Sequence, residues 1–139
     1  MKNWSGRLRQ ASANQRAAKT ELLPLPQPIR DVLSLEYHLQ LEALRAGAGS
    51  LMALQTLVRV AMASRMLGEL GYGKNADLPT DDYEKTASEA FSVGTEGSYT
   101  FNGDAVQKFA VLLTEHDTQM KTAPVRVIDQ VARRLERPN

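Results

Sequence analysis

Residues 50–70 have the sequence SLMALQTLVRVAMASRMLGEL, and this stretch decides the class of fold. Strong helix formers fill it, and apolar side chains occupy almost every direction around a helical wheel. Such a helix is stable when neighbours cover it on several sides, so the stretch predicts a central helix with Ser50 as its N-cap. Arg59, Arg65 and Glu69 interrupt the apolar run, which excludes a lipid-facing span and argues against a membrane partner.

The preceding segment, residues 28–44 (PIRDVLSLEYHLQLEAL), fits two patterns. Apolar and polar residues alternate over residues 33–41, which is typical of a strand. Leucine, glutamate, glutamine and alanine nevertheless favour a helix, and no β-branched residue follows Val32 in this segment. We therefore predict a helix that ends at Gly47 and forms a hairpin with the central helix, and a strand is the alternative.

Three further segments with helical spacing follow the central helix. Thr80 is the predicted N-cap of the first, and Asp104 is the predicted N-cap of the second, which extends to about Met120. The last helix begins after Pro124. The five segments together predict an all-α fold, a compact bundle of about five helices that forms a single domain over residues 23–139.

The first 22 residues differ in composition from the rest of the chain. They are rich in serine, asparagine, glutamine and alanine, and they carry five basic residues against one acidic residue. A segment with so few bulky apolar side chains does not repay the entropy of folding. We therefore predict that residues 1–22 form a flexible, disordered basic arm in front of the helical domain.

The composition excludes several kinds of chemistry. The 139 residues include no cysteine, which rules out disulfides, thiolate nucleophiles and thiolate metal sites. The chain contains neither a Gly-x-Ser-x-Gly motif nor a phosphate-binding glycine loop after a strand. Its first 20 residues lack the apolar stretch of a secretion signal. We therefore expect a cytoplasmic protein without a cofactor.

The two histidines supply the main hint of a metal or catalytic site. His38 and Glu42 are spaced one helical turn apart, so both can reach one ion from the same helix face. His116 lies between two acidic residues. The simpler interpretation is two surface histidines with acidic neighbours. One alternative is a small-molecule or metal-dependent enzyme with a site around His38, Glu42 and Arg59, and with His116 as a further metal candidate.

Basic residues gather at both ends of the chain, whereas residues 73–98 carry six acidic residues against two basic ones. Lysine and arginine on an arm, or along one helix face, can neutralise the phosphates of a nucleic acid. This distribution supports a second alternative, a nucleic-acid-binding accessory protein. Its candidate contacts are Lys2, Arg7, Arg9, Arg16, Lys19, Arg126, Arg133, Arg134 and Arg137.

The function that the sequence favours most is non-enzymatic. The central helix has so few polar positions that part of it can lie in a subunit interface, and the leucine-rich helix before it adds apolar surface. We expect a small helical interaction or regulatory protein that forms a homodimer and binds another macromolecule, a protein or a nucleic acid. The residues expected at the dimer interface are Leu35, Tyr37, Leu39, Met62 and Met66.

Overall fold

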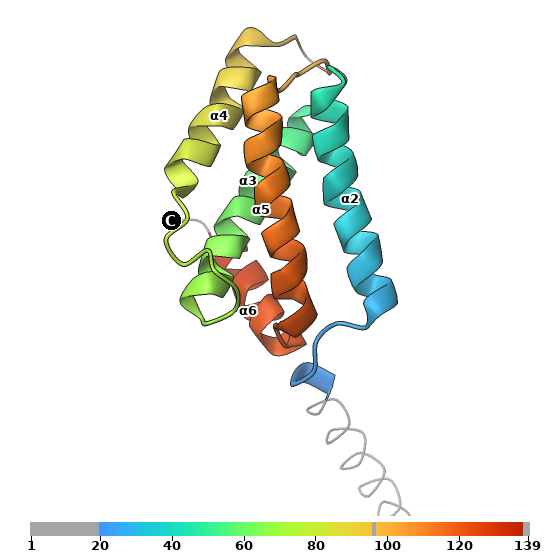
Figure 1. Cartoon of the computed structure of the whole chain (residues 1–139), viewed down its shortest axis with the longest axis vertical. Coiled ribbons are helices and arrows are strands. Elements are labelled where there is room, and N and C mark those ends of the chain that lie inside the picture. The colour runs from blue at the N-terminus through green and yellow to red at the C-terminus, as the bar shows by residue number, and fades with distance from the viewer. Residues whose placement is uncertain (1–19, 96, 138–139) are drawn as a thin grey trace, which may run out of the picture.

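The computed structural model describes residues 20–95 and 97–137. Five α-helices account for most of this part of the chain, and no strand forms within it (Figure 1). The helices predicted at residues 28–44 and 50–70 are confirmed, and the strand alternative for residues 33–41 is wrong. The elements are α2 (Gln27–Arg45), α3 (Leu51–Glu69), α4 (Thr80–Val93), α5 (Gly103–Thr122) and α6 (Val125–Glu136).

The predicted central position of α3 is confirmed. This helix packs against each of the other four, and α2 also packs against α5. Figure 1 shows α4 and α2 on opposite sides of α5, with α3 behind them and α6 at the lower end. None of the five helices is long and apolar enough to cross a membrane.

The alternating pattern of α2 arises because this helix is apolar on two sides. Tyr37, Leu41 and Leu44 are buried against the bundle. Leu35 and Leu39 take part in the same alternation, yet they remain 60% and 57% exposed. One apolar face toward the core and another toward solvent give an apolar residue at every second position, which imitates a strand.

The last helix begins after Pro124 as predicted, and of the three predicted N-caps one is confirmed and two are wrong. Ser50 caps α3 as predicted, because its Oγ accepts a backbone N–H hydrogen bond at 3.1 Å. The N-cap of α5 is Asn102 rather than Asp104, and its Oδ1 accepts a backbone N–H at 2.8 Å. Asp104 instead lies in the first turn, where it opposes the positive end of the helix dipole. Thr80 is already helical, and Pro79 occupies the N-cap position of α4 without a side-chain hydrogen bond.

The apolar core has two parts. In the larger part, between α2, α3, α4 and α5, Phe109 is completely buried and stacks on Phe101 with ring centroids 5.0 Å apart. The smaller part joins α6 to the C-terminal end of α3 through Leu67, Ala123 and Val131. Because α6 has only 12 residues, it covers that end of α3 and leaves the rest of the same side open.

The connection between α2 and α3 needs glycine at two positions. Gly47 has a φ of 79°, a left-handed conformation that side chains with a Cβ rarely adopt. At Gly49 a Cβ atom would lie 2.2 Å from Cδ2 of Leu44. The absence of that atom lets the backbone of Gly49 pair with that of Tyr99 through N–H···O bonds of 2.9 and 3.1 Å. This pair attaches the segment before α5 to the α2–α3 turn.

Candidate functional site

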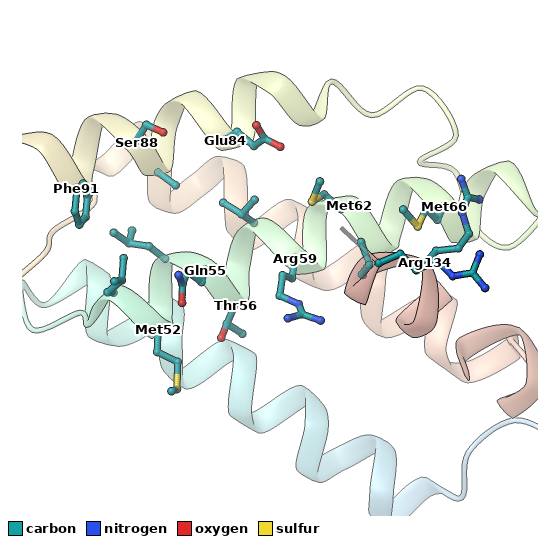
Figure 2. Close-up of a pocket in the computed structure, with 16 residues that line it drawn as sticks. Met52, Gln55, Thr56, Arg59, Met62, Met66, Glu84, Ser88, Phe91 and Arg134 are labelled. Carbon is teal, nitrogen blue, oxygen red and sulfur yellow. The ribbon is translucent and has the colours of Figure 1, made fainter. Parts of the chain in front are cut away.

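An open groove with a volume of about 890 Å³ runs along the outer side of α3. We call it the α3 groove. Its walls come from α3, from α4 and from the C-terminal end of α6, as Figure 2 shows. The large apolar side chains that line it include three methionines and come from all three helices. They include Met52, Met62, Met66, Phe91 and Leu135.

The groove exists because the helices beside α3 do not meet above it. Ala87 of α4 is buried against α3, and α6 reaches only as far as the second core cluster around Leu67. Between these contacts the surface of α3 stays open, and Met52 is 67% exposed. Phe91, near the end of α4, is 49% exposed. Apolar side chains of this size are thus left in solvent along one continuous depression.

Three arginines border the groove without acidic partners. Arg59 of α3 and Arg134 of α6 line it, as does Arg137, which follows α6. Each is exposed, and none forms an ion pair with any residue that the structure describes. Other arginines on the same helices are paired, since Arg65 meets Glu69 and Arg133 meets Asp129, each at 3.0 Å. The side of the groove toward α6 is therefore positively charged.

The opposite wall has the opposite charge. Glu84 of α4 lines the groove and is exposed. Asp81 and Asp82 lie in the first turn of the same helix, where the dipole favours acidic side chains. The groove is therefore an apolar depression with a cationic edge toward α6 and a carboxylate, that of Glu84, on its α4 wall.

On the inner side of α3 lies a buried polar network around Gln119 of α5. The Ser64 hydroxyl donates to Gln119 Oε1 at 2.7 Å, and Asn75 Nδ2 donates to the Ser64 hydroxyl at 2.8 Å. Gln119 Nε2 donates to the carbonyl oxygens of Ser64 at 2.8 Å and Tyr72 at 2.9 Å. His116 Nδ1 lies 3.2 Å from Gln119 Oε1 and carries the proton, since an amide oxygen only accepts. Burial lowers the pKa of His116 because it disfavours the charged ring.

A second polar cluster joins α2 to α5 around Asp117. The Tyr37 hydroxyl donates to Asp117 Oδ1, and His38 Nε2 lies 2.9 Å from Oδ2. Partial burial alone would raise the pKa of Asp117, but hydrogen bonds from Tyr37, His38 and Ser34 lower it below its ordinary value. Burial and the bond to this carboxylate raise the pKa of Tyr37. The cluster holds two helices together, and none of its residues lines the α3 groove.

Of the residues named for an enzyme site, only His38 and His116 lie near each other, since their rings pack on the Tyr37 ring with centroid distances of 5.3 and 5.5 Å. His38 bonds to Asp117, Glu42 pairs with Arg45, and Arg59 faces the α3 groove. His116 is buried in the Gln119 network. Within the described part of the chain, no group of three histidine, aspartate or glutamate side chains is arranged to hold a metal ion.

The candidate nucleic-acid contacts divide into two sets. Lys2, Arg7, Arg9, Arg16 and Lys19 lie outside the described residues, as does most of the predicted arm. The others are exposed near the C-terminus, and two of them border the α3 groove. This second set comprises Arg126, Arg133, Arg134 and Arg137.

The candidate dimer residues also fall at separate places. Tyr37 is buried within the bundle, whereas Leu35 and Leu39 project from the outer side of α2. Met62 and Met66 are half-buried and line the α3 groove. The structure thus presents two separate apolar surfaces where the sequence suggested one. Phe91 was not among the named site residues, although its place near the end of an amphipathic helix marks it as a surface aromatic.

No protein-family model matches the chain, and neither a curated protein nor a solved structure matches it. The function is therefore inferred from the site itself.

Proposed function

We propose that the chain is a non-enzymatic interaction module whose α3 groove binds an acidic amphipathic helix of a partner protein. One observation carries the proposal: an exposed apolar groove has unpaired arginines along one edge. The apolar floor supplies affinity because a bound partner removes its apolar surface from water. The arginines select the charge of the occupant.

The apolar lining suits a helical occupant. Met52 and Met66 lie 14 positions apart along α3, which corresponds to about 21 Å of helix. A partner helix of about four turns spans this length and presents apolar residues at spacings of three and four. Methionine side chains are unbranched and polarizable, so they adjust to the shape of an inserted side chain. Three methionines in one open groove therefore favour an adaptable binding surface.

The charges indicate an acidic rather than a basic occupant. Arg59 and Arg134 have no acidic partner within the described residues, so each can form a charge-assisted hydrogen bond with a carboxylate. A nucleic acid fits less well, because its phosphates would lie beside Glu84 on the opposite edge. The apolar floor also offers nothing to a phosphate backbone. The groove thus favours a protein segment with carboxylates along one flank.

The test uses two synthetic helical peptides of about 18 residues with the same leucine face. One carries glutamate along one flank of that face, the other carries lysine at the same positions, and the remaining polar positions are glutamine in both. Binding to the full-length protein is measured by fluorescence anisotropy. We expect the glutamate peptide to bind at least about tenfold more tightly than the lysine peptide. The double variant Arg59→Glu, Arg134→Glu is expected to reverse this order, because the edge of the groove then repels carboxylates.

Two control proteins locate the binding. Arg126→Glu changes the charge of α6 outside the groove and should leave the preference intact. Met62→Asp places a charge on the groove floor and should abolish binding of the glutamate peptide. Equal affinity for both peptides, or binding that survives Met62→Asp, would contradict the proposal. A DNA duplex that competes for the same arginines at moderate salt would favour the nucleic-acid alternative instead.

A further inference from the structure

The outer side of α2 carries a second apolar surface, separate from the α3 groove. Val32, Leu35 and Leu39 are 64%, 60% and 57% exposed, and α2 forms one edge of the bundle in Figure 1. Exposed residues along this side recur at alternating spacings of four and three, which is the heptad spacing of a two-helix interface. We call this set the α2 seam, and it comprises Pro28, Val32, Leu35, Leu39, Glu42 and Ala46.

We infer that the α2 seam pairs with the α2 seam of a second copy of this chain, and that the two helices run antiparallel. A surface paired with itself through a twofold axis needs no other partner chain, and an apolar stripe along one helix is self-complementary in this way. No residue of α2 lines the α3 groove, so this interface goes beyond the proposed function and leaves the groove free.

The residues that flank the seam indicate the antiparallel direction. One flank carries Asp31 and Arg45 near its two ends, and the other carries Glu36 near its centre. In an antiparallel pair, equivalent flanks face each other, so Asp31 lies opposite Arg45 of the partner subunit, twice per dimer. The same arrangement places Glu36 near Glu36 of the partner subunit, once per dimer, so two opposite-charge contacts stand against one like-charge contact. A parallel pair would bring Asp31 close to Glu36 of the partner subunit, also twice. Charge therefore favours the antiparallel arrangement.

The two charged groups are available for this contact. Asp31 is exposed and forms no ion pair with any described residue. Arg45 binds Glu42 of its own helix through Nε and Nη2, which leaves its Nη1 group without a partner among the described residues. An arginine fork offers five N–H donors, so Arg45 can bridge Glu42 and an aspartate across the interface.

The first test measures the mass of the full-length protein by sedimentation equilibrium up to about 0.5 mM. We expect a concentration-dependent dimer whose Kd rises more than about tenfold in the double variant Leu35→Glu, Leu39→Glu, because the seam then buries like charges. Val111 is 59% exposed on α5, and Val111→Glu is the matched control that should leave the dimer unchanged. A wild-type protein that stays monomeric, or a dimer indifferent to the seam variant, would overturn the inference.

The second test exchanges charges to establish the direction. Asp31→Arg alone sets arginine against arginine, and Arg45→Asp alone sets aspartate against aspartate, so each variant should dimerise several-fold more weakly than wild type. An equimolar mixture restores both opposite-charge pairs in an antiparallel heterodimer and should recover the wild-type Kd. If the mixture associates no better than either variant, the antiparallel arrangement is wrong. Circular dichroism of each variant verifies that the helices are intact.

Discussion

The inner and outer faces of α3 are built from the same helix and have opposite properties. On the inner face, Leu57 and Leu67 are buried, and Ser64 is tied to Gln119 through hydrogen bonds at both its hydroxyl and its carbonyl. On the outer face, Met52 is mostly exposed, and Arg59 has no ion-pair partner in the described chain. The inner face therefore specifies the fold, whereas the outer face exposes apolar side chains and charged groups that take no part in packing the bundle.

The residue types on the two faces follow this division. Leucine, alanine and serine fill the inner face, where packing is dense and each polar atom has a partner. Methionine and arginine are concentrated on the outer face, and both have long, adaptable side chains. Among the described residues, no buried side-chain nitrogen or oxygen lacks a hydrogen bond. Charged groups without a protein partner, such as Arg59, lie instead on the outer face, which is where binding is expected.

The largest expected effect separates the two faces directly. Leu57→Ala removes a completely buried side chain and should lower the free energy of unfolding by about 2–5 kcal/mol. Met52→Ala removes an exposed side chain from the same helix and should lower it by less than about 0.5 kcal/mol. Urea denaturation followed by circular dichroism measures both values. A large loss for Met52→Ala would mean that the groove is already covered in solution.

A smaller effect tests the polar part of the inner face. Gln119→Met keeps the side-chain shape but removes the amide, so the carbonyls of Ser64 and Tyr72 each lose a buried donor. We expect a loss of about 1–3 kcal/mol in the free energy of unfolding. Gln107→Met, an exposed position on the same helix, is the matched control and should change it by less than about 0.5 kcal/mol. Equal losses in the two variants would show that the network adds no specific stability.

The central position of α3 was predictable because a helix of this composition is stable only when other helices pack against it on several sides. A segment as apolar as residues 50–70 requires neighbours on several sides, and α3 packs against the four other helices. The ambiguity of α2 also has a physical cause, since Leu35 and Leu39 face solvent while Tyr37 and Leu41 face the core. Sequence alone does not reveal that a helix has two apolar faces, because hydrophobicity does not show which face is buried.

The site was less predictable because it depends on contacts between distant residues. Tyr37 bonds to Asp117, 80 positions away, and Ser64 bonds to Gln119, 55 positions away. Local spacing instead paired His38 with Glu42, although these side chains take separate partners. The α3 groove depends on the length of α6, which ends before it can cover the side of α3 where Met52 lies. The sequence shows where Met52 and Arg134 stand in the chain, but it does not show that both line the same groove.

The smallest expected effect is a dependence of stability on pH that comes from His116, the α5 residue bonded to Gln119 against the inner face of α3. Burial lowers the pKa of His116 below its ordinary value of 6.5, so the unfolded chain takes up a proton at a pH where the native protein does not. The contribution of the neutral His116 ring to the free energy of unfolding is therefore complete above about pH 6.5. It is lost as the pH falls through that value, with a slope of at most about 1.4 kcal/mol per pH unit. Urea denaturation between about pH 7 and pH 5 measures this slope, above the range in which the Asp117 carboxylate begins to lose its own contribution.

Two histidine variants assign the slope to its source. His116→Leu removes the titrating ring, while Gln119 Oε1 keeps the hydrogen bond from the Ser64 hydroxyl, so the part of the slope that comes from His116 should disappear. His38→Gln retains His116 and should retain that part. A slope that survives His116→Leu would mean that another group titrates in this range and that the burial of His116 is not its source. The outer face provides the contrast, since Met62→Gln leaves every titrating group in place and should leave the slope unchanged.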